Sequence, residues 1–220
     1  MSAFSEHPAP DIILCAFNAR WRHTAFGLRC LKANMGEMEK ITEILEFDLE
    51  TQAAQAVESV WQHSGERWPR IIGVSVAIWN VLQSTGFVQT LKRVAPETIV
   101  VLGGPEVSHE TMEQPVANAA DYVVCGAGEV VFATLCREIL ANSYPSHRII
   151  TAPPPDPATL SLPYDLYTER DIQHRELYVE STRGCPWRCS FCLSALDKTV
   201  TYFDQDHFFA AMQALLDRGA

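Results

Sequence analysis

Short apolar runs alternate with amphipathic segments along the first two thirds of the chain, and this alternation restricts the fold more than any other feature. The apolar runs lie at 11–17, 41–49, 70–76, 98–102 and 120–125, and segments with helical spacing lie at 24–35, 52–63, 81–94 and 129–140. The first run (DIILCAF) is almost entirely apolar, which is typical of a strand buried on both faces. The alternation predicts an α/β domain, a flavodoxin-like or Rossmann-like doubly wound parallel sheet, over residues 1–150.

The composition changes after this region. Residues 151–163 (TAPPPDPATLSLP) contain five of the 13 prolines, and proline cannot continue a helix or a central strand. We therefore predict a Pro-rich linker over 151–176. Residues 177–220 follow with one expected strand (177–182), a cysteine-containing loop and an amphipathic helix (204–218). These elements are too few to close a core, so we expect 177–220 to be the incomplete start of a second domain.

Charge and hydropathy exclude several classes of function. The chain has 17 Lys and Arg against 27 Asp and Glu, a formal net charge of -10, so it makes a poor general nucleic-acid binder. No apolar stretch is long enough to cross a membrane, and the first ten residues lack the pattern of a secretory signal. We expect a cytoplasmic protein without a membrane partner.

Three of the seven cysteines lie within eight residues. Cys185, Cys189 and Cys192 form the spacing C-x3-C-x2-C (CPWRCSFC) directly after Gly184. Three thiolates on a tight loop can hold three irons of a four-iron four-sulfur cluster and leave the fourth iron open to another ligand. A zinc knuckle completed by His or Asp, or a group of free thiols, is the alternative interpretation.

This loop resembles the cysteine motif of the radical S-adenosylmethionine superfamily, in which C-x3-C-x-aromatic-C follows the first strand of a partial βα barrel. Phe191 occupies the aromatic position, and 180–186 (ESTRGCP) is similar to the family's approach to the motif. The resemblance implies that Cys185, Cys189 and Cys192 bind the cluster. It also implies that S-adenosylmethionine chelates the open iron and yields a 5′-deoxyadenosyl radical after one-electron reduction. The family's later Gly-Gly-Glu contact to S-adenosylmethionine has no match in this chain.

Small and polar residues follow several of the expected strands in the first domain. In a doubly wound sheet, ligands bind at the carboxyl ends of the strands near the switch in strand order. Residues there include Ser75, Gly103, Gly104, Gly126 and Gly128. Glycine lets the backbone approach a ligand closely, and Gly128 opens a helix whose amides can face a polar ligand. The alternative is that these glycines only form tight strand–helix turns.

The same residues carry a second resemblance. The segments GVS (73–75), VVLGGP (100–105) and DYVVCGAGE (121–129) resemble the cobalamin-binding domain found N-terminal to some radical S-adenosylmethionine enzymes. The resemblance implies that Ser75, Gly103, Gly104, Gly126 and Gly128 bind cobalamin, with the slot for its nucleotide tail between them. Trp79, just after an expected strand, would either cover a corrin face or belong to the core.

One motif of related cobalamin domains is missing. Methionine-synthase-like domains carry Asp-x-His-x-x-Gly, whose histidine ligates cobalt. Aligning His23 with that histidine puts Trp21 in place of the aspartate and Phe26 in place of the glycine. No acceptor that would fix the tautomer of His23 is evident beside it in the sequence, so we expect a loop or surface histidine.

Together the two resemblances imply a cobalamin-dependent radical S-adenosylmethionine enzyme, with methyl transfer to an unactivated carbon or a rearrangement as its chemistry. They imply a flavodoxin or ferredoxin as electron donor and a small molecule or peptide as substrate, and they assign no catalytic side chain. Because the barrel is incomplete, we expect this chain to be inactive alone. Two alternatives stay open: a methylthiotransferase-like radical enzyme, which needs three further converging cysteines, and a non-catalytic cobalamin-binding module whose cysteine loop is inert or binds zinc.

Overall fold

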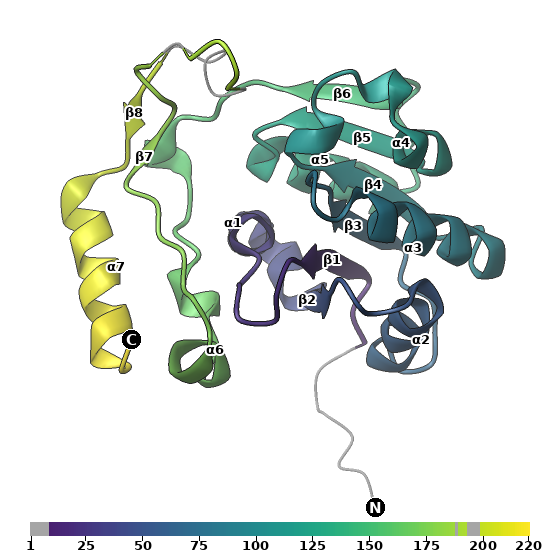
Figure 1. The fold of residues 1–220 in the computed structure, drawn as a ribbon, viewed down its shortest axis with the longest axis horizontal. Helices are drawn as coiled ribbons and strands as arrows, with labels where there is room; N and C mark the ends of the chain where they lie inside the picture. The colour runs from purple at the N-terminus through teal and green to yellow at the C-terminus, as the bar shows by residue number, and fades with distance from the viewer. Residues whose placement is uncertain (1–8, 188, 193–198) are drawn as a thin grey trace, which may run out of the picture.

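The first part of the chain folds around one parallel sheet. The computed structural model describes residues 9–187, 189–192 and 199–220 (Figure 1). The sheet has six strands in the order β2-β1-β3-β4-β5-β6, and every neighbouring pair is parallel. The strands are β1 (Ile12–Asn18), β2 (Thr42–Asp48), β3 (Ile71–Ser75), β4 (Ile99–Gly103), β5 (Tyr122–Gly126) and β6 (Ile149–Ala152). This order is the flavodoxin-like one, and it confirms the predicted doubly wound fold.

Helices cover both faces of the sheet. They are α1 (Phe26–Ala33), α2 (Ala53–His63), α3 (Val81–Val94), α4 (Pro115–Ala119) and α5 (Glu129–Leu140). Apolar side chains of α2, α3 and α4 pack with Ile13, Cys15 and Phe17 of β1 in one buried cluster, while those of α1 and α5 pack with Leu14 and its neighbours on the opposite face. Because successive strand residues alternate between faces, both clusters need apolar residues, which explains the continuous run in β1.

The sequence did not predict the sixth strand. Residues Ile149–Ala152 pair in parallel with β5 and extend the sheet past residue 150, the predicted end of the domain. The strand has only four residues and runs directly into the proline-rich stretch, so it gives little periodic signal. The predicted linker that follows contains the short helix α6 (Glu169–His174) and two isolated 3-10 turns.

The strand predicted at 177–182 does not form, and only β7 (Thr182–Arg183) pairs with β8 (Thr201–Tyr202). The backbone of the preceding segment is satisfied by two buried tyrosines instead. The Tyr167 hydroxyl accepts from the Tyr178 amide (2.9 Å) and donates to its carbonyl (2.6 Å). Tyr164 makes the same pair of bonds to Glu180, both at 3.1 Å. Two side-chain hydroxyls therefore replace a neighbouring strand.

The segment after the sheet packs against α1 and β2. Figure 1 shows β7, β8 and α7 (Gln205–Asp217) as a layer on the side of α1. Tyr164, Tyr167, Ile172 and Leu215 form a small third buried cluster, against which Phe26 of α1 packs. The predicted helix over 204–218 is thus confirmed, and its apolar face docks through this cluster onto the sheet domain.

A buried ion-pair network fastens the same junction. Arg29 of α1 lies 3.1 Å from Glu46 of β2 and 3.0 Å from Asp171 of α6, and Arg175 contacts the same two carboxylates at 2.7 and 2.9 Å. Burial by itself would raise the pKa of Glu46, but its hydrogen bonds to both arginines outweigh burial and hold that pKa below its ordinary value. The pKa of Asp171 is lowered in the same way, by bonds to Thr168 and Arg175 that outweigh burial.

No helix in the described part of the chain is long and apolar enough to cross a membrane.

Candidate functional site

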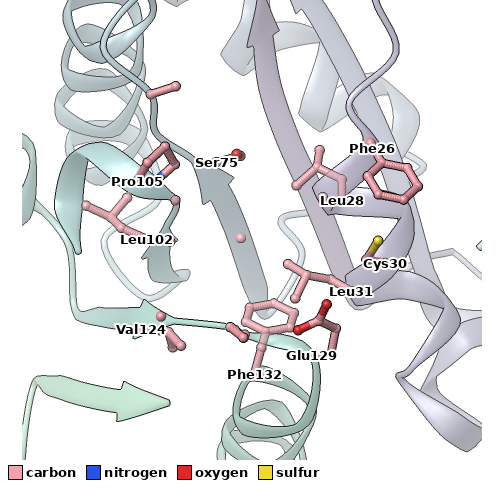
Figure 2. Close-up of a pocket in the computed structure, with 18 of the residues that line it drawn as sticks. Phe26, Leu28, Cys30, Leu31, Ser75, Leu102, Pro105, Val124, Glu129 and Phe132 are labelled. Carbon is pink, nitrogen blue, oxygen red and sulfur yellow. The ribbon is translucent and has the colours of Figure 1, made fainter. Parts of the chain in front are cut away.

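A pocket of about 450 Å³ opens at the carboxyl edge of the sheet (Figure 2). It lies between α1 and α5, beside the point where the strand order switches from β1 to β3. All five residues predicted from the sequence to bind a cofactor line it: Ser75, Gly103, Gly104, Gly126 and Gly128. Because they come from the ends of β3, β4 and β5 and the start of α5, the fold gathers residues up to 53 positions apart into one wall, from Ser75 to Gly128.

Strand alternation explains why these positions face the pocket. Val101 of β4 belongs to the cluster on the α1 and α5 face, so Gly103, two residues later, lies on the same face. In β3, Val74 belongs to the opposite cluster, which leaves Gly73 and Ser75 on the pocket face. The pocket therefore continues the apolar α1 and α5 layer up to the sheet edge, where small residues leave space.

The predicted glycines differ in what they do. Gly104 has φ +111°, and a Cβ there would lie 2.3 Å from the Val76 carbonyl oxygen. Gly126 has φ +99°, and its Cβ would lie 2.5 Å from the Ala152 carbonyl oxygen. Both are required by the turns themselves. A Cβ at Gly103 would meet only the Val124 carbonyl oxygen at 3.7 Å, so Gly103 keeps the pocket open without being required by the backbone.

The pocket walls are mostly apolar, with Leu28, Leu31, Leu102, Val124 and Phe132 around them (Figure 2). The ionisable groups are Glu129, Glu180 and Arg183, two acids and one base. Cys30 also lines the pocket, and burial raises the pKa of its thiol to about 12, so it is neutral at ordinary pH. Glu129 occupies the first turn of α5, so the positive end of this helix already faces a carboxylate of the chain, and the largely apolar walls suit a ligand with a large apolar part.

A second pocket of about 440 Å³ adjoins the first. The two share Phe26, Gly27, Leu28, Ser75, Ala77 and Trp79 as lining residues, so they form one continuous depression along the sheet edge. Trp79 is 56% exposed and lines both pockets, which places it at their common mouth and not in the core. An aromatic side chain in this position is able to cover a flat ligand, one of the two roles that the sequence left open.

His23 lines the second pocket and does have an acceptor to orient it. Its Nδ1 lies 2.9 Å from the Glu176 carboxylate and 2.6 Å from the Tyr178 hydroxyl. An Nδ1–H that donates to the carboxylate leaves Nε2 as the unprotonated nitrogen. His23 lies in the loop between β1 and α1, as expected, but it does have an acceptor. The sequence around His23 does not show this partner, because it comes from a segment about 150 residues later.

The cysteine loop lies beyond β7. Cys185 is half-buried, whereas Cys189 and Cys192 are exposed. Within the described residues, no three Cys, His, Asp or Glu side chains come together as a ready metal site, so the three thiols share a loop but not one coordination centre. Their spacing and accessibility suit a soft metal centre chemically, and their assignment as cluster ligands stays a prediction. Cys15, Cys30 and Cys136 are buried, and burial raises the pKa of each of their thiols.

A doubly wound domain with a pocket at the carboxyl edge is the architecture of nucleotide- and cofactor-binding domains. Within that class, residues 14–136 match the B12 binding domain family. The match covers more than half of the chain, and the chain belongs to this family.

Curated relatives carry this domain within larger proteins. The chain is 28% identical over 172 residues to the cobalamin-dependent radical SAM methyltransferase TokK of Streptomyces tokunonensis. This alignment covers 63% of this chain and 24% of TokK. It is 27% identical over 151 residues to the uncharacterized methyltransferase PH0819 of Pyrococcus horikoshii, and this alignment covers 58% of this chain and 32% of PH0819. The chain thus spans only a quarter to a third of the length of these relatives.

Solved structures show the same fold at low sequence identity. The cobalamin-dependent S-adenosylmethionine radical enzyme OxsB, with aqua-cobalamin and S-adenosylmethionine bound, superposes with a TM-score of 0.71 at 14% identity, covering 94% of this chain and 32% of OxsB. The radical S-adenosylmethionine methyltransferase TsrM from Kitasatospora setae superposes with a TM-score of 0.68 at 16% identity, and the alignment covers 94% of this chain and 46% of TsrM. Because 94% of this chain is aligned in both cases, the likeness extends beyond the sheet domain into the segment after it.

Proposed function

We propose that this chain binds cobalamin in the joined pockets and forms the N-terminal part of a cobalamin-dependent radical S-adenosylmethionine methyltransferase. The observation that carries the proposal is the pocket between α1 and α5, which is largely apolar, open at the sheet edge and lined by Ser75, Gly103, Gly104, Gly126 and Gly128. Family membership over residues 14–136 and the likeness to TokK, a cobalamin-dependent radical SAM methyltransferase, support the same conclusion.

Each part of the depression has its own task in this proposal. The apolar slot beside Gly103 and Phe132 takes the nucleotide tail of the cofactor, and the shared mouth at Trp79 takes the edge of the corrin. His23, oriented by Glu176 and Tyr178, presents a polar group in the second pocket. The chain's own residues thus bind and orient the ligand and keep water away from its apolar parts.

For the second segment, we propose that Cys185, Cys189 and Cys192 bind a four-iron four-sulfur cluster together with S-adenosylmethionine. When bound, these groups supply a 5′-deoxyadenosyl radical and cobalamin supplies a methyl carrier. A flavodoxin or ferredoxin is the electron donor in this proposal, and a small molecule or peptide is the methyl acceptor. The methylthiotransferase alternative has less support, because it needs three further cysteines on one loop, whereas Cys15 and Cys136 are buried in clusters on opposite faces of the sheet.

The first test is a titration of the purified chain with hydroxocobalamin, followed by gel filtration and absorbance spectroscopy. The protein titrated is the variant with Ser in place of Cys185, Cys189 and Cys192, because accessible cysteines can ligate a soft metal centre and would bind the corrin non-specifically. Co-elution at about one corrin per chain is expected for the pocket proposed here. A folded chain that retains no corrin would overturn the cobalamin proposal.

The second test concerns the cysteine loop and is independent of the first. The unsubstituted chain is reconstituted anaerobically with iron and sulfide, and its metal and acid-labile sulfide are measured. We expect the chain to bind iron and acid-labile sulfide, and both to be lost when Cys185, Cys189 or Cys192 is replaced by Ser. Cys136→Ser is the control at a buried thiol. Zinc without sulfide would favour the non-catalytic cobalamin-binding module.

A further inference from the structure

Arg183 belongs to both candidate sites. Its side chain lines the pocket between α1 and α5, and its backbone lies two residues before Cys185. The guanidinium Nη2 lies 2.6 Å from a carboxylate oxygen of Glu129, the first residue of α5. Its Nε lies 3.0 Å from Glu180. Arg183 is therefore an arginine of the second segment that completes the wall of a pocket in the sheet domain.

The Glu129 end of this ion pair is fixed. Its side chain is only 7% exposed, and it follows Gly128 directly at the start of α5 (Figure 2). Leu31 and Phe132 also line the pocket around it. A buried carboxylate whose partner is removed is left as an uncompensated charge, so Glu129 holds Arg183 strongly in place.

The Arg183 end is fixed to the loop through its backbone. Arg183 pairs with Thr201 of β8, and its guanidinium lies 5.4 Å from the ring centroid of the buried Phe203. The next residue, Gly184, packs closely against the segment before β8, and a Cβ there would lie 1.8 Å from the Thr199 carbonyl oxygen. Cys185 follows at once. Only Gly184 separates Arg183 from Cys185, and the Thr199 carbonyl confines the backbone at Gly184.

We propose that Arg183 is a positioning residue whose ion pair with Glu129 couples occupancy of the pocket to the conformation of 182–187, the segment that contains Cys185. A ligand that fills the pocket contacts the Arg183 side chain and changes the free energy of the loop, and by linkage the state of the loop changes the affinity of the pocket. The inference rests on the proposed function, because cobalamin is the ligand used as the probe.

Hydrogen–deuterium exchange of the backbone over 182–187 tests the coupling. The parent is the chain with the three loop cysteines replaced by Ser, with and without saturating hydroxocobalamin. Arg183→Met and Glu129→Gln each break the ion pair, and Arg183→Lys keeps the charge. Arg70→Met is the matched control, since Arg70 also contacts α5 but at its far end, through the carbonyls of Ile139 and Leu140.

Cobalamin is expected to slow exchange at 182–187 by about fivefold or more in the parent, which is the low end of typical coupling between sites. The effect is expected to persist in Arg70→Met, to be partly kept in Arg183→Lys and to vanish in Arg183→Met and Glu129→Gln. A merely structural ion pair would change exchange with and without ligand alike.

A ligand effect of parental size in corrin-loaded Arg183→Met would overturn the coupling, as would a parent that binds corrin without any change in the loop. Both results leave cobalamin binding intact. A parent that binds no corrin would overturn the proposed function instead, and this inference with it.

Discussion

Gly103 and Gly104 are neighbours in the sequence, yet the structure predicts opposite effects of substituting them. Gly104 has φ +111° and ψ 169°, a region that is essentially restricted to glycine, and its Cβ would collide with the Val76 backbone. Alanine there is expected to cost about 1–3 kcal/mol of strain. Alanine at Gly103 meets no close atom and restricts the unfolded chain, which stabilises by about 0.4–1 kcal/mol. The two variants should differ in unfolding free energy by about 1.4–4 kcal/mol.

Urea unfolding followed by circular dichroism measures this difference, and an unchanged slope would show that only stability has changed. Gly103→Leu then separates folding from binding, because its side chain points into the pocket while the backbone stays as it is. We expect Gly103→Leu to unfold near the Gly103→Ala midpoint and to bind hydroxocobalamin at least about tenfold more weakly. Equal stability of the two alanine variants would refute the conclusion that the turn requires Gly104. Full corrin binding by Gly103→Leu would refute the conclusion that Gly103 leaves space for the ligand.

Three further predictions concern the junction between the sheet domain and the segment after it. Glu46→Gln leaves two buried guanidinium groups short of a charge partner and should lower the unfolding free energy by about 3–5 kcal/mol in urea titrations; a loss below about 1 kcal/mol would contradict a buried network. Folding lowers the pKa values of Glu46 and Asp171 below their ordinary values of 4.5 and 3.8. The stabilisation that these two carboxylates give is therefore complete above their ordinary pKa values and is lost as the pH falls through the lowered values of the folded chain. Urea unfolding midpoints measured from neutral to acidic pH will detect this loss. Tyr167→Phe removes both hydroxyl bonds to Tyr178 and should cost about 1–3 kcal/mol, with faster hydrogen exchange over 177–180 and unchanged exchange in the sheet if the loss is local.

The sheet domain was predictable because its signal is local. The helices at 81–94 and 129–140 were predicted with the bounds that the structure gives them, since each carries apolar residues at helical spacing that pack on one face of the sheet. The position of the pocket followed from topology alone, because parallel strands bring their carboxyl ends to one edge. The sixth strand was missed for the opposite reason: four residues directly before a proline-rich stretch are too few to show the alternation of apolar and polar residues that marks a strand.

The composition of the site was less predictable than its place. Sequence reasoning grouped the glycines together, but only backbone geometry separates Gly104, which the turn requires, from Gly103, which leaves space. Arg183 and Tyr178, which line the pockets from the segment after the sheet, and Glu176, which contacts His23, were not identified as site residues. Nothing in their local pattern marks them, because their role comes from docking against α1 and α5.

That docking suggests why the two segments belong to one structural unit. The junction buries two arginines and two carboxylates, a costly choice if the segments only needed to adhere, since apolar contacts such as Phe26 on Tyr164 would suffice. Ion pairs with fixed partners specify one arrangement, whereas apolar contacts tolerate sliding. Arg183 and Tyr178 line the pockets in this arrangement, so the ionic network holds in place a segment that forms part of the pocket walls. Loosening the network by Glu46→Gln should therefore weaken corrin binding even though Glu46 lines neither of the two joined pockets.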